Sequence, residues 1–251
     1  MAKILAISSQ VVFGPVGLNA IVPALQAEGH EVLAIPTVLL SNHPGLGPPV
    51  GGAIQIEPYL NALENLRAIE NLDAVITGYF ANAAQVQSAA HLIAKLKPAI
   101  VLIDPVLGDH GKLYVSEAVA LEIKTKLIPI ATIMTPNAFE LSWLTGRPVL
   151  NEGEAIIAAR SLNCREVIVT SIPAGPNLAS SRITRTEVTT VINPKRDHVP
   201  NGTGDMLSGL YLARQLKTNR QAALEQSLEI LLRAITLSGN TKILAVAEAL
   251  T

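Results

Sequence analysis

Residues 198–205 read HVPNGTGD and continue directly into the apolar sequence MLSGLYLA. The glycines at 202 and 204 permit backbone angles and a close ligand approach that other residues hinder. The apolar continuation predicts a helix over 204–216, whose first turn has unpaired backbone N–H groups that attract anions. Asp205 in that turn is either a favourable helix-capping acid or a group that holds a hydroxyl while the neighbouring amides hold a phosphoryl group.

The rest of the chain alternates short aliphatic runs with longer, more polar segments. The runs predict strands at 4–7, 32–35, 74–77, 100–103, 132–134 and 167–170. Helices are expected at 18–28, 58–69, 83–96, 116–126, 138–144, 152–162, 204–216 and 221–237. This alternation favours an α/β fold with a mostly parallel, doubly wound sheet.

Three segments fall outside that alternation. Residues 11–17 are expected to form a loop after the first strand, and 179–183 with 187–192 an edge hairpin. Residues 40–52 hold seven glycines and prolines, which argues against regular structure and for a surface flap or a plain connector.

Composition limits the class of protein. The 251 residues are 49% hydrophobic and 16% charged, so a packed chain with one domain over 1–251 is expected. The 19 basic and 20 acidic residues give a net charge of −1, which disfavours nucleic acid as a partner. The single cysteine, Cys164, fits a reducing cytoplasm, and we expect neither a signal peptide nor a membrane span.

Polar side chains recur where the predicted strands end. Because the carboxyl ends of parallel strands meet at one edge of a sheet, these residues are better explained as one site than as separate turns. They are Ser9, Tyr79, Asp104, Thr135, Asn137, Thr170 and Ser171.

Two acids could serve a divalent metal in phosphoryl transfer. Asp104 ends a strand, and Glu140 follows Asn137 by three residues, so both could reach Mg²⁺ directly or through water. Glu140 is equally explained as a favourable first-turn acid. Neither a Walker-type phosphate loop nor a G-x-S-x-G hydrolase elbow occurs in the sequence.

At this point the chain resembles the pyridoxal kinase (vitamin B6 kinase) family of the ribokinase-like superfamily, nearly from end to end. The matching segments, in order, are SSQVVFG at 8–14, TVLLSNH at 37–43, Gly78-Tyr79, DPVLGD at 104–109 with LYV at 113–115, TPNAFE at 135–140, Thr170-Ser171 and GTGD at 202–205. The GTGD and DPVLGD strings are shared across the superfamily, whereas the SNH entry to the flap and the DPVLGD–LYV spacing indicate the B6 branch. The resemblance implies a three-layer α/β/α sandwich.

It also implies the site residues. Asp205 would be the base that activates the substrate hydroxymethyl group, with Gly202, Thr203 and Gly204 as the anion hole. The residues implied for the substrate are Ser9, His43, Tyr79 and Tyr114. Those implied for ATP are Asn137, Glu140, Thr170, Ser171 and Thr203. Those implied for the metal are Asp104, Glu140 and Thr135. ATP, Mg²⁺ or a similar divalent ion, and K⁺ as the monovalent ion are the implied cofactors. A homodimer is expected on other grounds, because the apolar residues of the flap and the exposed edge need cover.

Alternatives remain at this stage. Pro44 replaces a threonine that often contacts substrate in the family, so a hydroxymethylpyrimidine kinase of thiamine synthesis is the close rival. A sugar kinase is less favoured because no separate β-sheet lid is predicted. A catalytically idle pyridoxal phosphate-binding protein would not need Asp205, Asp104 and Glu140 together.

Overall fold

The computed structural model describes residues 1–66, 69, 71–217 and 220–251, which include a nine-stranded sheet. The strand order across this sheet is β11-β10-β9-β8-β5-β4-β1-β2-β3. The bounds are β1 (Lys3–Phe13), β2 (Glu31–Asn42), β3 (Gly51–Ala53), β4 (Ala74–Thr77), β5 (Ile100–Ile103), β8 (Ile133–Met134), β9 (Glu166–Ala174), β10 (Asn177–Thr184) and β11 (Val188–Pro194). From β2 to β9 each neighbouring pair is parallel, whereas β3 and the β10–β11 hairpin pair antiparallel at the two edges.

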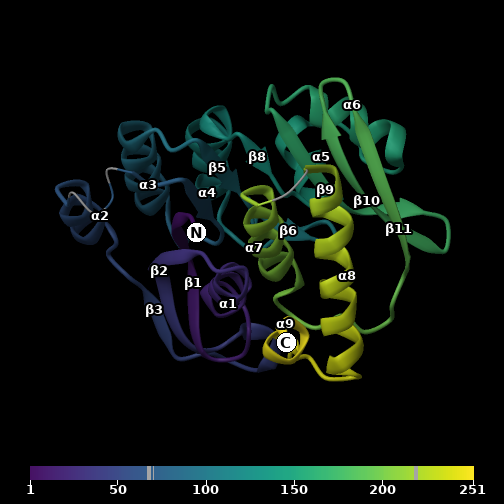
Figure 1. Cartoon of the computed structure of the whole chain (residues 1–251), viewed down its shortest axis with the longest axis horizontal. Coiled ribbons are helices and arrows are strands. Elements are labelled where there is room, and N and C mark those ends of the chain that lie inside the picture. Colours follow the sequence, from purple (N-terminus) through teal and green to yellow (C-terminus); the bar gives the residue numbers. More distant parts are fainter. Residues whose placement is uncertain (67–68, 70, 218–219) are drawn as a thin grey trace.

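Helices cover both faces of the sheet (Figure 1). Their bounds are α1 (Leu18–Ala27), α2 (Glu57–Glu64), α3 (Ala83–Leu96), α4 (Glu117–Glu122), α5 (Ala138–Thr145), α6 (Glu152–Arg160), α7 (Thr203–Gln215), α8 (Arg220–Ser238) and α9 (Val246–Leu250). Buried side chains of α1, α7, α8 and α9 share one core cluster, and those of α2 to α6 share the other. The expected three-layer α/β/α sandwich is thereby confirmed.

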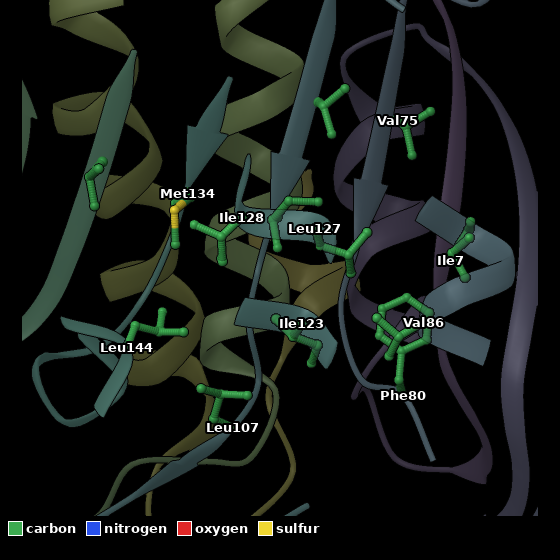
Figure 2. Packing of buried hydrophobic residues seen from close by; sticks show 14 of the residues in the cluster. Ile7, Val75, Phe80, Val86, Leu107, Ile123, Leu127, Ile128, Met134 and Leu144 are labelled. Carbon is green, nitrogen blue, oxygen red and sulfur yellow. The ribbon is translucent and has the colours of Figure 1, made fainter. Parts of the chain in front are cut away.

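The sheet residues divide between the two cores by alternation. Ile4 and Ala6 of β1 face the α7 side, whereas Leu5 and Ile7 face the α3 side. Figure 2 shows the α3-side cluster, in which Phe80 from the loop after β4 is buried with Val86 of α3. Because both faces are covered, the central strands are aliphatic throughout, as the sequence pattern suggested.

The first two strands differ from the prediction. β1 continues through 11–13, where a loop was expected, and β2 continues to Asn42. Residues 40–52 are also more regular than expected, because they hold the end of β2, the 3₁₀ turn η1 (Pro44–Leu46) and the start of β3. Gly51 has φ 124°, and a Cβ there would lie 2.0 Å from the Leu39 carbonyl oxygen, so glycine is what lets β3 pair closely.

Other boundaries shift less. The predicted helix over 116–126 is α4 followed by a π turn (Ile123–Leu127) and a 3₁₀ turn (Ile128–Ile130). The predicted helix over 58–69 ends at Glu64 as α2, and its positions 67–68 lie outside the described residues. The short β6 (Gly108–Asp109) and β7 (Lys112–Leu113) and helix α9 were not predicted. No helix in the described ranges is long and apolar enough to span a bilayer.

Candidate active site

Asp205 lies in the first turn of α7, as expected. Gly202 is the N-cap residue with φ 92°, and a Cβ on it would lie 2.0 Å from the Pro15 carbonyl oxygen. Burial raises the pKa of Asp205 to about 6, although part of the side chain reaches solvent and the Gly17 N–H donates to it. This carboxylate is therefore able to accept a proton near neutral pH.

Two further glycines allow the chain to close around this acid. A Cβ on Gly78 would lie 2.4 Å from Ser8 Oγ and 3.9 Å from Asp205 Oδ1. A Cβ on Gly17 would lie 2.2 Å from both the carbonyl oxygen and Oγ of Ser9. Gly78 after β4 and Gly17 before α1 thus lie beside the start of α7. Ser9 was expected to follow the first strand but lies inside β1, at the register shift in its pairing with β2, close to the residue that binds Asp205.

Asp104 lies at the end of β5 and is buried. Ser208 of α7 donates to Asp104 Oδ2 at 2.9 Å, and the Ser208 hydroxyl is also 2.9 Å from that of Thr135. Burial, followed by the charges of Glu140 and Asp205, raises the pKa of Asp104 well above its ordinary value. The sequence analysis missed Ser208, which follows Asp205 by three residues and therefore shares its helix face.

The Asp104 turn is conformationally strained. Val106 has φ 43°, which is unusual for a β-branched residue, and its N–H donates to the Asp104 carboxylate. Such strain of order 1–3 kcal/mol persists where surrounding contacts enforce it and is found preferentially at functional sites.

The Glu140 side chain binds the backbone of the same loop. Its Oε1 accepts from the N–H groups of Leu107 at 2.8 Å and Gly108 at 3.4 Å, and its Oε2 accepts from Asn137 N at 2.9 Å. Asn137 in turn caps α5 through Glu140 N, so the two form a capping box. Burial raises the pKa of Glu140 to about 7 despite these donors. The helix-capping explanation is confirmed, and the direct metal role stays a prediction.

Most of the residues expected to contact the nucleotide lie after β8 or inside β9, because β9 continues past the predicted strand end at Thr170 to Ala174. Thr170 forms a parallel bridge with Asn137, and its N–H donates to Pro136 at 3.0 Å. Ser171 is exposed with φ 57°, next to the irregularity in the β9–β10 pairing. The Asn137–Thr170 pair is therefore brought together as expected.

Tyr79 and His43, which are expected to contact the substrate ring, lie after β4 and β2, respectively. Tyr79 follows Gly78 and is held through its backbone, because its N–H donates to Ser8 Oγ at 3.2 Å. His43 is the residue before η1, and partial burial lowers its pKa. A Cβ on Gly45 in that turn would lie 3.0 Å from Asn201 Nδ2, so the flap lies against the residue that precedes the expected anion loop at 202–204.

Tyr114 differs from the other ring-side candidates. Burial comes first among the causes that raise its pKa, and the charges of Asp109 and Glu140 follow. It directly follows β7, and its N–H donates to the Leu107 carbonyl at 2.7 Å. Its expected role in a lid over the substrate stays a prediction.

The site concentrates negative charge. The Asp104 carboxylate lies near the charges of both Glu140 and Asp205, and in the described ranges none of the three forms a salt bridge. The same ranges hold no cluster of three or more His, Cys, Asp or Glu side chains arranged as a metal site. Mg²⁺ in phosphoryl transfer needs only one or two carboxylates, because phosphate oxygens and waters complete its shell.

Known proteins are similar to this chain in sequence and in fold. A family model described as phosphomethylpyrimidine kinase matches residues 61–246. The pyridoxine/pyridoxal/pyridoxamine kinase of Bordetella avium is 36% identical over 250 residues, which cover 92% of this chain and 84% of that relative.

Solved structures agree with the sequence relatives. Pyridoxal kinase from Entamoeba histolytica superposes with a TM-score of 0.93 at 26% identity, covering 100% of this chain and 94% of that one. Pyridoxal kinase from Leishmania donovani, in complex with ADP and pyridoxine, has a TM-score of 0.91 at 28% identity, covering 99% and 94%.

Proposed function

This chain belongs to the pyridoxal kinase family of the ribokinase-like fold, so it is a kinase of vitamin B6, and we propose how its residues perform the transfer. The reaction moves the γ-phosphoryl group of ATP to the hydroxymethyl group of pyridoxal, pyridoxine or pyridoxamine. Complexes of a relative with ADP and pyridoxine support both substrates.

Asp205 is the proposed base. Its carboxylate accepts the hydroxymethyl proton while that oxygen bonds to the γ-phosphorus and the bond to the β-phosphate oxygen breaks, which releases ADP. The amides of Gly202, Thr203 and Gly204 at the start of α7 stabilise the charge on the moving group. The observation that supports this most is the raised pKa of a carboxylate placed at a helix N-terminus with a left-handed glycine cap.

A divalent cation fits the acidic side of the site. The Asp104 carboxylate is buried beside Glu140 and Asp205, and a cation would relieve that repulsion. We assign Mg²⁺ to Asp104 and, directly or through water, to Glu140, where the ion would neutralise phosphate charge. We assign the monovalent ion, K⁺, to the neighbourhood of Asp104 and Thr135.

Substrate contacts follow the two flanks. We assign the nucleotide to Asn137, Glu140, Thr170, Ser171 and Thr203. The pyridine ring is assigned to Ser9, His43 and Tyr79 with Tyr114 as lid. These roles rest on the family resemblance together with the positions of the residues along one sheet edge.

One coupled assay tests the function. ADP release is measured with pyridoxal, pyridoxine, pyridoxamine, hydroxymethylpyrimidine and ribose as acceptors. We expect turnover with the B6 vitamers. Turnover with hydroxymethylpyrimidine alone would favour the thiamine-synthesis rival, and binding of pyridoxal phosphate without ADP release with any acceptor would favour an idle binder.

We further propose a homodimer whose interface is formed by the end of β1, by β2 and by the segment that enters β3. Val12 near the end of β1, Leu39 of β2 and Val50 directly before β3 are 77%, 48% and 78% exposed. Exposed apolar side chains on neighbouring strands are typical of a protein interface. Sedimentation equilibrium should give a dimer mass that Val12→Lys lowers to that of the monomer; an unchanged mass would reject this face.

A reducing cytoplasmic location is also proposed. Cys164 Sγ points at the carbonyls of Ala131 and Glu166, and burial raises the pKa of the thiol, so it is a packing residue rather than a reactive one. Cell fractionation tests the location, and recovery in the membrane pellet or in the medium would reject it.

A further inference from the structure

The loop that carries Tyr79 is held by buried side chains from two other segments. Tyr79 N donates to Ser8 Oγ at 3.2 Å, and the Tyr79 carbonyl accepts from Thr37 Oγ1 at 2.7 Å. Both Ser8 and Thr37 have no exposed surface. The backbone of Tyr79 is therefore fixed on both sides by β1 and β2.

Gln85, in the first turn of α3, joins this loop to the flap. Its Oε1 accepts from Ala81 N at 2.8 Å, and its Nε2 donates to the carbonyls of Thr37 at 2.7 Å and Ile54 at 2.8 Å. Only 3% of Gln85 is exposed. The Gln85 amide group thus donates to two segments that lie far from it in the sequence.

These partners are the two ends of the flap. Thr37 lies in β2 before the flap begins, and Ile54 directly follows β3, where the flap returns. Phe80 anchors the intervening loop by burying its ring in the α3-side core (Figure 2). One side chain therefore fixes the flap, which carries His43, relative to the loop that carries Tyr79.

We propose that Gln85 is a positioning residue for the vitamer, which sets the separation between the flap and the Tyr79 loop. The inference rests on the proposed function, because it assumes that the ring binds between these two segments. Gln85 contacts no residue assigned to ATP or metal in the described part of the chain, so its effect should be confined to the ring side.

The experiment compares four variants in steady-state kinetics with pyridoxal and ATP. Gln85→Met keeps the shape but removes the amide; Gln87→Met on the exposed side of the same helix is the matched control. Thr37→Val replaces the hydroxyl that binds the Tyr79 carbonyl with a methyl group, whereas Thr37→Ser keeps that hydroxyl. This second pair keeps the test available if Gln85→Met fails to fold.

We expect Gln85→Met and Thr37→Val to lower kcat/KM for pyridoxal by about 10- to 10²-fold, since misplacement by about 1 Å costs up to that much in rate, with a rise in KM for pyridoxal as part of the loss. KM for ATP should stay unchanged, as should both constants in Gln87→Met and Thr37→Ser. Equal rises in both KM values, or no rise for pyridoxal, would reject the inference alone. A wild type that phosphorylates no B6 vitamer would reject the proposed function and this inference with it.

Discussion

The phosphate side and the ring side of the site are built in opposite ways. At the proposed phosphate side, the start of α7 has no side-chain cap, and the buried Asp104 carboxylate lies near the charges of Glu140 and Asp205, with no salt bridge to any of the three among the described residues. At the ring side, Ser8, Thr37 and Gln85 are neutral, buried and hydrogen-bonded to backbone groups. The first arrangement lacks charge partners, whereas the second is satisfied without a ligand.

This difference separates the expected effects of substitution. Charged groups held in a strained, desolvated state gain most from a ligand that neutralises them, so the phosphate side should control turnover. A satisfied neutral framework mainly fixes geometry, so the ring side should control vitamer binding.

Apart from substitution of Asp205 itself, Gly202→Ala should have the largest effect. The added Cβ would lie 2.0 Å from the Pro15 carbonyl oxygen at a φ of 92°, so the anion loop must move. Loss of one such donor costs about 10²- to 10³-fold in kcat, and we expect at least that. Gly239→Ala is the matched control, because its φ of 58° is also left-handed but nothing lies within 4 Å of its Cβ. Similar activity losses in both variants would indicate a general stability effect.

The two sides also differ in how far the sequence predicted them. The start of α7 was predicted because GTGD before an apolar run has local meaning: glycine conformations, helix amides and one acid within a single turn. The mostly parallel sheet and the shared edge with Asp104, Asn137 and Thr170 were predicted from the alternation of elements, whereas the order of the strands was not.

The ring side was predicted less well because its contacts are distant in sequence. Gln85 binds carbonyls of Thr37 and Ile54, 48 and 31 residues away, and nothing local to AAQVQ distinguishes it from the exposed Gln87. The glycines and prolines of 40–52 suggested an irregular flap, but β3 tolerates Gly51 because it pairs with backbone atoms of β2. Tertiary hydrogen bonds overrode the local preference there.

Deletion of residues 44–49 should have the next largest effect. The flap contacts Asn201, and Lys242 Nζ donates to the Gly45 carbonyl at 2.9 Å, so its removal should admit water beside the anion loop. We expect the ratio of ATP hydrolysis to pyridoxal phosphorylation to rise, by up to about 10²-fold.

Lys242→Met should raise the same ratio less, because it loosens the flap without removing it. Lys195→Met, at an exposed lysine, is its control. A ratio that stays at the wild-type value after the deletion would make the flap a connector.

Ser208→Ala should have a smaller effect at the phosphate side. It removes the donor to Asp104 and the partner of Thr135, and a hydrogen bond to a charged group contributes about 1.5–3 kcal/mol. We expect kcat to fall about tenfold, with KM for pyridoxal unchanged. Ser227→Ala, which removes an equally buried helix hydroxyl that donates to Ala223, should retain full activity. A rise in the KM for pyridoxal would contradict the separation of the two sides.

Asp205→Asn should alter thermal stability with pH. Burial raises the folded-state pKa from 3.8 to about 6, so the folded wild type binds this proton more tightly than the unfolded chain does. The resulting stability is complete below pH 3.8 and lost as pH rises through about 6. The variant has no such loss, so its Tm should exceed that of the wild type by a few degrees above this pH and match it below. An equal Tm difference at every pH would contradict the raised pKa.

The role of Asp205 as the base is tested most directly by measuring kcat of Asp205→Asn together with a calorimetric titration with ATP. Asparagine keeps the size and a hydrogen-bonding oxygen but cannot accept the hydroxymethyl proton, so we predict a kcat loss of about 10²- to 10⁴-fold. It also removes a negative charge that faces the phosphates, so ATP should bind as tightly as before or slightly more tightly. Near-normal kcat in a folded variant would show that Asp205 is only a helix-capping acid and would contradict the account.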